Sequence, residues 1–471
     1  MKRLFLGVLI AISAVTMEAQ TKLTFEQALA RAMQVNNTVE RTRQDIGVAM
    51  AARNQLLSAV LPRITLSGDL TRNSIEQKFG EGSDSIAILP RNDWAYRVVL
   101  EQPVYAGRRE LRAYSQAKIN VENAREGTLA SEDGALLRVS SSYLAVLNAD
   151  RRVDIEKRNI ELAQRRLVQA QAFYEAGEVT KVDVYRAETA QKAAQRLLAA
   201  AGQQREYAVA SLRTELDLDG TIEVSAPEHP LEALPDEAAL IARAQSQRPD
   251  VTIAENNLRI ASLEVSKQRG YWLPTVTFDG GWIQQKTPFP ANSYAYGALR
   301  FNVPLFQAGE VIARVAGAKS REKQAEIALE EAKVNAREDV RRALADLHSA
   351  ETGLQLAGEQ LEAAQAEYDQ AFELYRAQEA TSLDVASSET SLADARRAVA
   401  EETLNRDLAA LRVWFAAGSI KTAVGIQGAA SGAPGAEETT PSTASPDATP
   451  ATLPPTTSND VTPRNKAGNE N

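Results

Sequence analysis

The chain has 471 residues, a formal net charge of −9 and no cysteine. The acidic balance argues against a nucleic-acid partner, because nucleic-acid binding needs a basic face. Without cysteine there is no disulfide, no thiolate nucleophile, no Cys-ligated zinc and no lipid attached to Cys.

The two ends of the chain differ from the rest. Residues 1–19 have the pattern of a secretory signal peptide, with two basic residues before an apolar run from Leu4 to Val15. This run is too short to span a bilayer, and we expect cleavage after Ala19. No later stretch is long and apolar enough for a transmembrane helix, so any membrane insertion would use β-strands. Residues 419–471 become rich in Pro, Thr, Ser, Ala and Gly and are predicted to be a disordered tail.

The first of two repeats is predicted over residues 20–216. After two short helical patterns, alternating apolar and polar residues predict strands at about 64–73 and 94–104. A polar, Gly-containing loop at 73–92 joins them, so the pair is expected to form a β-hairpin. One face carries Ile64, Leu66, Leu70, Trp94, Tyr96, Val98 and Leu100, and the other carries Arg97 and Glu101.

Two long helical patterns complete this repeat, at about 107–176 and 183–216, with a short turn between them. At 1.5 Å per residue the first helix is on the order of 100 Å long. The segment 217–235 is rich in Pro, Asp and Glu. We expect it to cross the outside of the helical bundle at mid-height, as an equatorial connection to the second repeat.

The chain contains an internal duplication, in which the same series of elements occurs twice. An offset of 201 residues maps Asp183 onto Asp384, and an offset of 212 further upstream maps Gly68 onto Gly280. Such a register is not expected by chance. The second repeat spans 236–418, with strands at about 275–285 and 294–304 and long helices at about 309–378 and 384–417.

Apolar residues recur every seven positions in the second hairpin, which indicates supercoiled packing of its two helices. The repeat consists of Val340, Leu347, Leu354, Leu361, Tyr368 and Tyr375, answered by Val385, Leu392 and Val399.

The strands match those of a transmembrane barrel, which are about ten residues long with one apolar and one polar side. A half-buried sheet in a soluble protein gives the same alternation, so the strands alone leave both readings open. The signal peptide and the lack of a membrane helix favour the barrel. Because about eight strands are needed to close one and lipid does not tolerate open edges, several chains are expected to share a single barrel.

Residues suited to catalysis are scarce. The only histidines are His229 and His348, and neither stands in a metal-ligand spacing. There is no phosphate-binding glycine loop and no nucleophile elbow. We therefore predict that the protein is not an enzyme and has no cofactor and no metal site.

Each long hairpin turns at a segment in which Thr stands three residues before Asp. These pairs are Thr180 and Asp183 in the first hairpin and Thr381 and Asp384 in the second. A carboxylate at the start of the returning helix caps free N–H groups and meets the favourable end of the helix dipole. Capping alone explains either residue. If several chains converge, Asp384 would also form a ring of negative charge, a common device for selecting cations.

The chain resembles the TolC-type outer membrane efflux protein family, the outer membrane factors. The resemblance covers about residues 23–418 and is carried by the order and duplication of the elements, by Leu-Pro at 61–62 and by Pro-Leu-Phe-Gln-Ala-Gly at 304–309. It implies an α+β membrane protein that forms a homotrimer. Four strands per chain would close a 12-stranded β-barrel, continued by an α-helical barrel. The expected location is the outer membrane of a Gram-negative bacterium, with a large periplasmic part.

The resemblance also implies partners and a function. Outer membrane lipid would surround the barrel, and a periplasmic adaptor would join the tunnel to an inner membrane pump. The chain would be the passive duct of a tripartite efflux or type I secretion system. The alternative is a secreted or periplasmic coiled-coil scaffold, or the adaptor itself, with the strands in a soluble domain.

The family's aperture and gate positions transfer onto this sequence one by one. Asp384 matches the first aspartate of the aperture ring, but the second ring position is Ser387. The arginine position of the interhelix gate is Ala380, so the gate either uses another cation or is looser. The matching gate residues and the candidate cations are Asp183, Tyr375, Lys181 and Arg376.

Two further groups of positions follow from the resemblance. The adaptor-docking tips would be Gly177 and Val179 in the first hairpin and Gln378 and Ala380 in the second. Gln378 replaces a family glycine, which leaves the contact there open. In the strands, we predict that Arg97 and Glu101 face the lumen of the barrel.

Overall fold

The computed structural model describes residues 21–80, 86–220, 222–225, 233–288 and 290–425, all of which belong to one compact unit, residues 1–427. The predicted signal peptide and the tail from residue 426 onward lie outside the described residues. Within these ranges no helix combines the length and the apolar character that crossing a bilayer requires.

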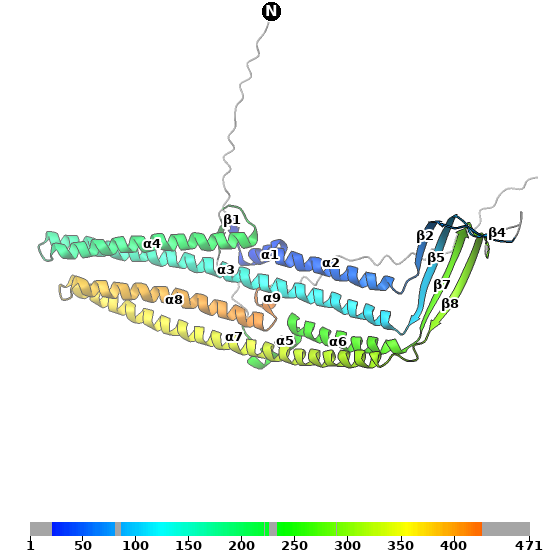
Figure 1. Cartoon of the computed structure of the whole chain (residues 1–471). Coiled ribbons are helices and arrows are strands. Elements are labelled where there is room, and N and C mark those ends of the chain that lie inside the picture. The colour runs from blue at the N-terminus through cyan, green and yellow to red at the C-terminus, as the bar shows by residue number, and fades with distance from the viewer. Residues whose placement is uncertain (1–20, 81–85, 221, 226–232, 289, 426–471) are drawn as a thin grey trace, which may run out of the picture. The chain divides into compact units, whose positions relative to one another are not determined.

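Two long helical hairpins dominate the structure (Figure 1). Helices α3 (Arg109–Glu175) and α4 (Lys181–Leu216) form the first, and α7 (Glu310–Arg376) and α8 (Ser382–Ala416) form the second. The return helices are about half as long as α3 and α7. Shorter helices occupy the remaining length beside α3 and α7, namely α1 (Phe25–Val35), α2 (Asn37–Ser58), α5 (Glu237–Gln247) and α6 (Pro249–Arg269).

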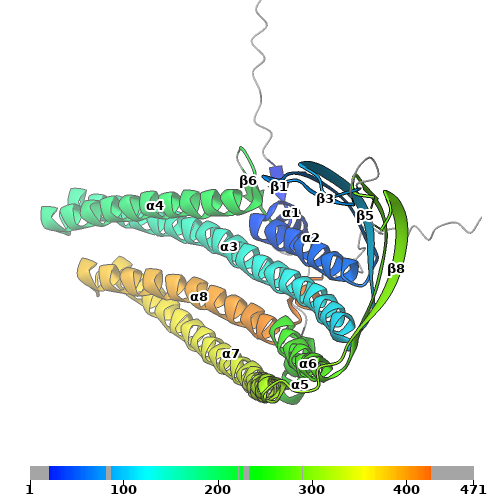
Figure 2. The same cartoon turned by 45° about the vertical axis from the view of Figure 1, so that its right-hand side comes forward.

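Four antiparallel strands form the main sheet, at the end of the helices opposite the hairpin tips (Figure 1). Their order is β2 (Arg63–Arg72), β5 (Asn92–Ala106), β7 (Thr275–Gln285) and β8 (Ser293–Asn302). The two predicted hairpins therefore lie side by side, joined through β5 and β7. Figure 2 shows the four strands curving together beyond the ends of the helices.

The segment 73–92, predicted as a loop, contains two short strands, β3 (Gln77–Phe79) and β4 (Ile86–Leu89), which pair antiparallel. The prediction of a loop was therefore wrong at these residues, whereas the four predicted strands are all present in the main sheet. Strands β3 and β4 are only three and four residues long, which is too short for alternation to reveal them.

The equatorial connection contains β6 (Ile222–Val224), which pairs in parallel with β1 (Thr21–Leu23). This small sheet is fixed by Tyr143 of α3, whose Oη lies 2.8 Å from the carbonyl oxygen of Leu23 and 2.7 Å from that of Ser225. Tyr143 is fully buried and contacts Phe25 edge to face, with ring centroids 5.2 Å apart. One buried tyrosine thus joins the start of the chain to the connection between the repeats.

The predicted tail begins too early at residue 419. Residues 420–423 form a short helix, α9, in which Ile420 is buried in the hydrophobic core. Lys421 Nζ lies 2.7 Å from a carboxylate oxygen of Glu132 on α3. Four residues carry no readable period, so only the tertiary contacts reveal this helix.

A close backbone approach marks the junction between sheet and helices. Gly107, with φ +65°, follows β5, and a Cβ atom there would lie 2.3 Å from the carbonyl oxygen of Gly270. Gly270 opens the 3₁₀ turn after α6, and a Cβ there would lie 2.5 Å from the carbonyl oxygen of Gly107. Only glycine fits at either position, because both obstructing atoms belong to backbone.

We predict that Gly107→Ala destabilises the protein by about 2–4 kcal/mol, the sum of a backbone clash and a strained positive φ. The control is Gly127→Ala in α3, where the space around the new methyl group is open and alanine favours the helix by about 0.5–1 kcal/mol. Thermal loss of helical circular dichroism measures both. Equal midpoints for the two variants would show that the close approach does not constrain the fold.

Candidate functional site at the hairpin tips and the charged sheet face

The turns at the two hairpin tips have the same backbone geometry. In the first, Gly177 has φ +78° and its N–H donates to the carbonyl of Tyr174 at 3.0 Å. In the second, Gln378 has φ +63° and its N–H donates to the carbonyl of Tyr375 at 3.1 Å. A left-handed glutamine is unusual, since only glycine adopts this conformation at no steric cost. The second turn therefore has the same geometry with glutamine as the first has with glycine, but an exposed side chain projects where Gly177 has none.

Each returning helix begins with a capping box. The Thr381 N–H and hydroxyl donate to Asp384 Oδ2 at 2.9 and 2.7 Å, and the Thr180 N–H and hydroxyl donate to Asp183 Oδ2 at 3.2 and 2.9 Å. These bonds from Thr381 hold the pKa of Asp384 below its usual range. The helices start two residues before the predicted positions, so both aspartates stand in the first turn.

The two aspartates differ in their surroundings. Asp183 Oδ1 also accepts a hydrogen bond of 2.5 Å from Ser382 of the other hairpin, which is the main reason its pKa is lowered. Asp384 is exposed, as is Ser387 one turn later on the same helix. Asp183 thus links the two tips, whereas the side-chain hydrogen bonds of Asp384 stay within its own turn.

A cleft of about 470 Å³ between the two tips contains Asp183 and Tyr375 among its lining residues. Tyr375 is 3% exposed and packs edge to face on Phe173, with ring centroids 5.4 Å apart. Burial, and secondarily the charge of Asp183, raises the pKa of Tyr375. Its hydroxyl has no hydrogen-bond partner among the described residues. The structure therefore brings the two predicted gate residues into one cleft, with Ser382 as the direct partner of Asp183.

The candidate gate cations have other partners. The Lys181 ammonium lies over the ring of Tyr185, 5.5 Å from its centroid, and Arg376 pairs with Glu373 at 3.2 Å. The cation near Asp183 is Arg186, at 3.6 Å. Arg186 lies close to Asp183 because residues three positions apart share one face of a helix.

Two ion pairs between α3 and α8 escaped the sequence analysis. Arg166 Nη1 lies 2.6 Å from Glu389 Oε2, and Arg397 Nε lies 2.7 Å from Glu156 Oε1. Arg166 and Glu389 are both largely buried, with side chains 7% and 13% exposed. Burial raises the pKa of Glu389 although Arg166 opposes it. In the sequence, each of these residues is visible only as a charged residue on a helical seam. That pattern does not identify a partner 223 positions away.

The other tip positions lie at the surface. Gly177 and Gln378 are exposed, and Val179 and Ala380 are half-buried. The four positions therefore lie at the two turns themselves, in pairs related by the repeat.

The charged face of the sheet carries Arg97 and Glu101, as the alternation predicted. Arg97 forms an ion pair with Asp69 on the neighbouring strand β2. Arg300 Nε of β8 lies 2.8 Å from Asp279 Oδ2 of β7, and Asp279 stands directly opposite Glu101 in the register of β5 and β7. Charged residues from all four strands thus share one face.

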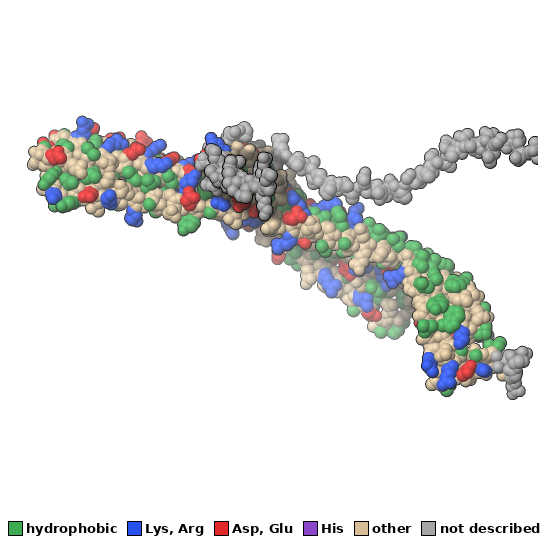
Figure 3. All heavy atoms as spheres, turned by 90° about the horizontal axis from the view of Figure 1, so that it is seen from above, with side chains coloured by type: hydrophobic (Ala, Val, Ile, Leu, Met, Phe, Trp, Pro, Cys, Tyr) green, Lys and Arg blue, Asp and Glu red, His purple; other side chains and the backbone are tan. Residues whose placement is uncertain are grey.

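The opposite face of the sheet is apolar and has no covering layer within the described chain. Its side chains are exposed to solvent by 71% at Ile64, 73% at Leu66, 83% at Leu70 and 67% at Phe301. In the space-filling view, hydrophobic side chains gather over the strands, and charged side chains lie along the helices and at the far end of the strands (Figure 3). Large apolar residues at these exposures indicate contact with lipid or another chain.

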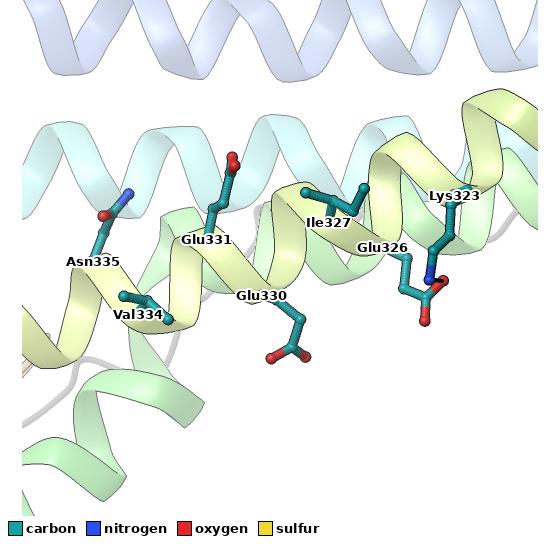
Figure 4. A pocket seen from close by; sticks show the side chains of 7 residues that line it. All are labelled: Lys323, Glu326, Ile327, Glu330, Glu331, Val334 and Asn335. Atoms are coloured by element: carbon teal, nitrogen blue, oxygen red, sulfur yellow. Dashed lines mark hydrogen bonds and ion pairs between the residues drawn. The ribbon is translucent and has the colours of Figure 1, made fainter.

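A shallow groove of a different kind lies along α7, and its lining residues all come from this one helix (Figure 4). Ile327 and Val334, seven residues apart, are 50% and 43% exposed. Acidic residues surround them, among them Glu330 and Glu331. Because the described residues that line the groove all belong to α7, this apolar pair at heptad spacing is a helix-packing seam that no other described element fills.

The sequence profile of the family described as outer membrane efflux protein matches residues 27–216 and 240–419. The chain belongs to this family. The predicted resemblance and the outer membrane location are confirmed, and the large helical part is periplasmic. Membership favours an efflux channel over a scaffold or adaptor and classes the chain with transport proteins rather than enzymes.

Similar proteins and solved structures support the same fold. The outer membrane efflux protein BepC of Brucella suis biovar 1 (strain 1330) is 23% identical over 401 residues, which are 82% of this chain and 83% of BepC. A crystal structure of a membrane protein from Pseudomonas aeruginosa has a TM-score of 0.71 at 18% identity and covers 84% of this chain and 93% of that one. CusC has a TM-score of 0.72 at 17% identity, with 84% and 92% covered. The predicted combination of long helices and strands is confirmed.

We predict that Arg166→Met costs this outer membrane efflux protein about 3–5 kcal/mol at pH 7, because Glu389 is left buried without its partner. The folded-state pKa of Glu389 would then lie further above its unfolded value. The loss of stability is therefore absent below the unfolded-state pKa of Glu389 and grows as the pH rises from that pKa to the folded-state pKa. Denaturation at pH 7 and near pH 4.5 measures this difference.

The control is Arg376→Met, which breaks an ion pair whose side chains are 57% and 69% exposed and should cost less than about 1 kcal/mol. If Arg166→Met costs no more than this control, or if its cost does not depend on pH, the buried pair does not fasten α3 to α8.

Proposed function

We propose that this chain is the outer membrane channel-tunnel of a tripartite efflux or type I secretion system and works as a homotrimer. The observation that carries the proposal is the main sheet, which is apolar on one face, charged on the other, and unpaired at both edges within the described chain. Four strands are too few to close a barrel, whereas three copies supply twelve. Lipid would then cover the apolar face and water would fill the charged interior.

The helices support a tunnel below this barrel. The exposed seam of Ile327 and Val334 on α7 offers a second copy an apolar ridge of the kind that long helices pack together. Three copies of the two hairpins would then form an α-helical barrel across the periplasm. Transport through it is passive, because the energy comes from the partner pump.

A periplasmic adaptor would dock at the hairpin tips and connect the tunnel to an inner membrane pump. The contact positions are Gly177 and Val179 in the first turn and Gln378 and Ala380 in the second. The equal geometry of the two turns supports one type of adaptor contact used twice, with the Gln378 side chain distinguishing the second site.

The aperture would lie at the same end. Asp384 is exposed and ionised, so three copies would place a ring of carboxylates at the constriction, with Ser387 as an uncharged second ring. The gate would consist of Asp183, Ser382 and Tyr375 in the cleft between the tips. Opening then requires separation of Asp183 from Ser382, while Arg166 and Glu389 hold α3 to α8 further along.

We predict that Asp384→Ala weakens cation selectivity and block by multivalent cations several-fold in planar-bilayer recordings, because each chain loses its ring charge. Asp384→Asn separates this effect from capping, since its side-chain oxygen still accepts hydrogen bonds from Thr381. The hydrogen bonds from Thr381 hold the pKa of Asp384 below its usual range, so the carboxylate is ionised in recordings made at pH 7. Unchanged selectivity in both variants would place the constriction elsewhere.

We also predict that cysteines at Arg97 and Glu101 react with a membrane-impermeant thiol reagent in the inserted protein, since both would face the water-filled lumen. The natural chain has no cysteine, so background labelling is absent. Val98→Cys, adjacent on β5 but on the apolar face, is the matched control and should be protected. Protection of Arg97→Cys together with labelling of Val98→Cys would mean that the sheet is inverted.

A further inference from the structure

Strands β2 and β8 form the two edges of the main sheet, and each is ten residues long. Resting on the proposed homotrimer, we propose that β8 of one copy pairs antiparallel with β2 of the next in a single register. In this register Arg300 stands opposite Asp69 of the neighbouring copy, and Leu299 stands opposite its Leu70. The two repeats within one chain determine this register.

The two repeats match residue by residue in the sheet. An offset of 212 carries β2 onto β7, and an offset of 201 carries β5 onto β8. The pair Arg63 and Glu101 thereby becomes Thr275 and Asn302, which is the pairing that the structure shows. The other end agrees too, since Arg72 opposite Asn92 becomes Gln284 opposite Ser293. The two hairpins are therefore equivalent in register along their whole length.

The two repeats meet where β5 pairs with β7, and this pairing has a defined register. In a ring of equivalent hairpins, β8 meets the next β2 in the way that β5 meets β7. Val98 opposite Trp282 becomes Leu299 opposite Leu70, and Val99 opposite Gly281 becomes Arg300 opposite Asp69. The register of the subunit joint is thus copied from one observed within the chain.

The chemical character of the side chains favours the same register independently of the symmetry. Arg300 and Asp69 both lie on the charged face, and Leu299 and Leu70 both lie on the apolar face, where they are 52% and 83% exposed. A slip of one residue would turn charged side chains toward lipid. A slip of two would place Arg300 opposite Ser67 or Thr71, neither of which carries a charge.

The copied register also extends the ion pairs already present. Arg300 contacts Asp279 within its own chain, and Asp69 contacts Arg97 within its own. Placing Arg300 opposite the neighbouring Asp69 joins these two pairs into a row of alternating sign that crosses the subunit joint. Opposite charges across a strand pair are stabilising, and like charges are not.

Because the chain has no cysteine, oxidative cross-linking tests the register directly. The test variant combines Leu299→Cys with Leu70→Cys, since residues directly opposite have Cβ atoms about 4.5–5.5 Å apart. The matched control combines Leu299→Cys with Leu66→Cys. Leu66 is also an exposed leucine of β2 on the same face, but it lies four positions away, on the order of 13 Å.

Outer membrane fractions are oxidised and run on denaturing gels, and the mass of the wild-type oligomer in detergent is measured alongside. We expect covalent dimers and trimers from the first variant, at least about tenfold more than from the control. Preferential linking of the control, or no linking of either variant from a trimeric protein, overturns the register and leaves the proposed function standing. A monomeric wild type overturns the homotrimer itself.

Discussion

The hydrogen-bonding groups at the edges of the main sheet are the constraint on which the rest of this structure depends. Strands β2 and β8 each leave one side unpaired within the described chain. In hydrocarbon every such group costs several kcal/mol, so an open sheet has no place in a bilayer. The apolar face is a second constraint, because no layer of the described part of the chain covers Leu66 or Leu70. Association of copies within a membrane would pair the strand edges and cover the apolar face with lipid.

Duplication gives this protein two similar halves in which matching residues have different surroundings. Asp183 and Asp384 occupy matching positions and cap matching helices, yet one bonds to Ser382 of the other hairpin and the other is exposed. The turns have likewise diverged, with Gly177 in one and a left-handed Gln378 in the other. The backbone is the same in the two halves while the side chains differ, so the proposed gate and the proposed aperture ring occupy matching positions of the repeat.

The sequence was informative where a regular period extends over many residues. It located the hairpins and assigned Arg97 and Glu101 to the charged face, because alternation along a strand determines which side each residue faces. It missed the strands β3 and β4 and the helix α9, which are too short to show a period. For the gate it proposed Lys181 or Arg376 as the replacement cation, or a looser closure. The structure places Arg186 and Ser382 beside Asp183.

The sequence by itself determined the duplication, the two faces of the strands and the capped turns, because each of these depends on neighbours within a few residues or on an internal offset. Only the tertiary structure decided that β5 lies beside β7, that Gly107 meets Gly270, and that Arg166 pairs with Glu389. These contacts join residues far apart in the chain. Their choice is set by shape and charge after the helices and strands have packed, and no local pattern records it.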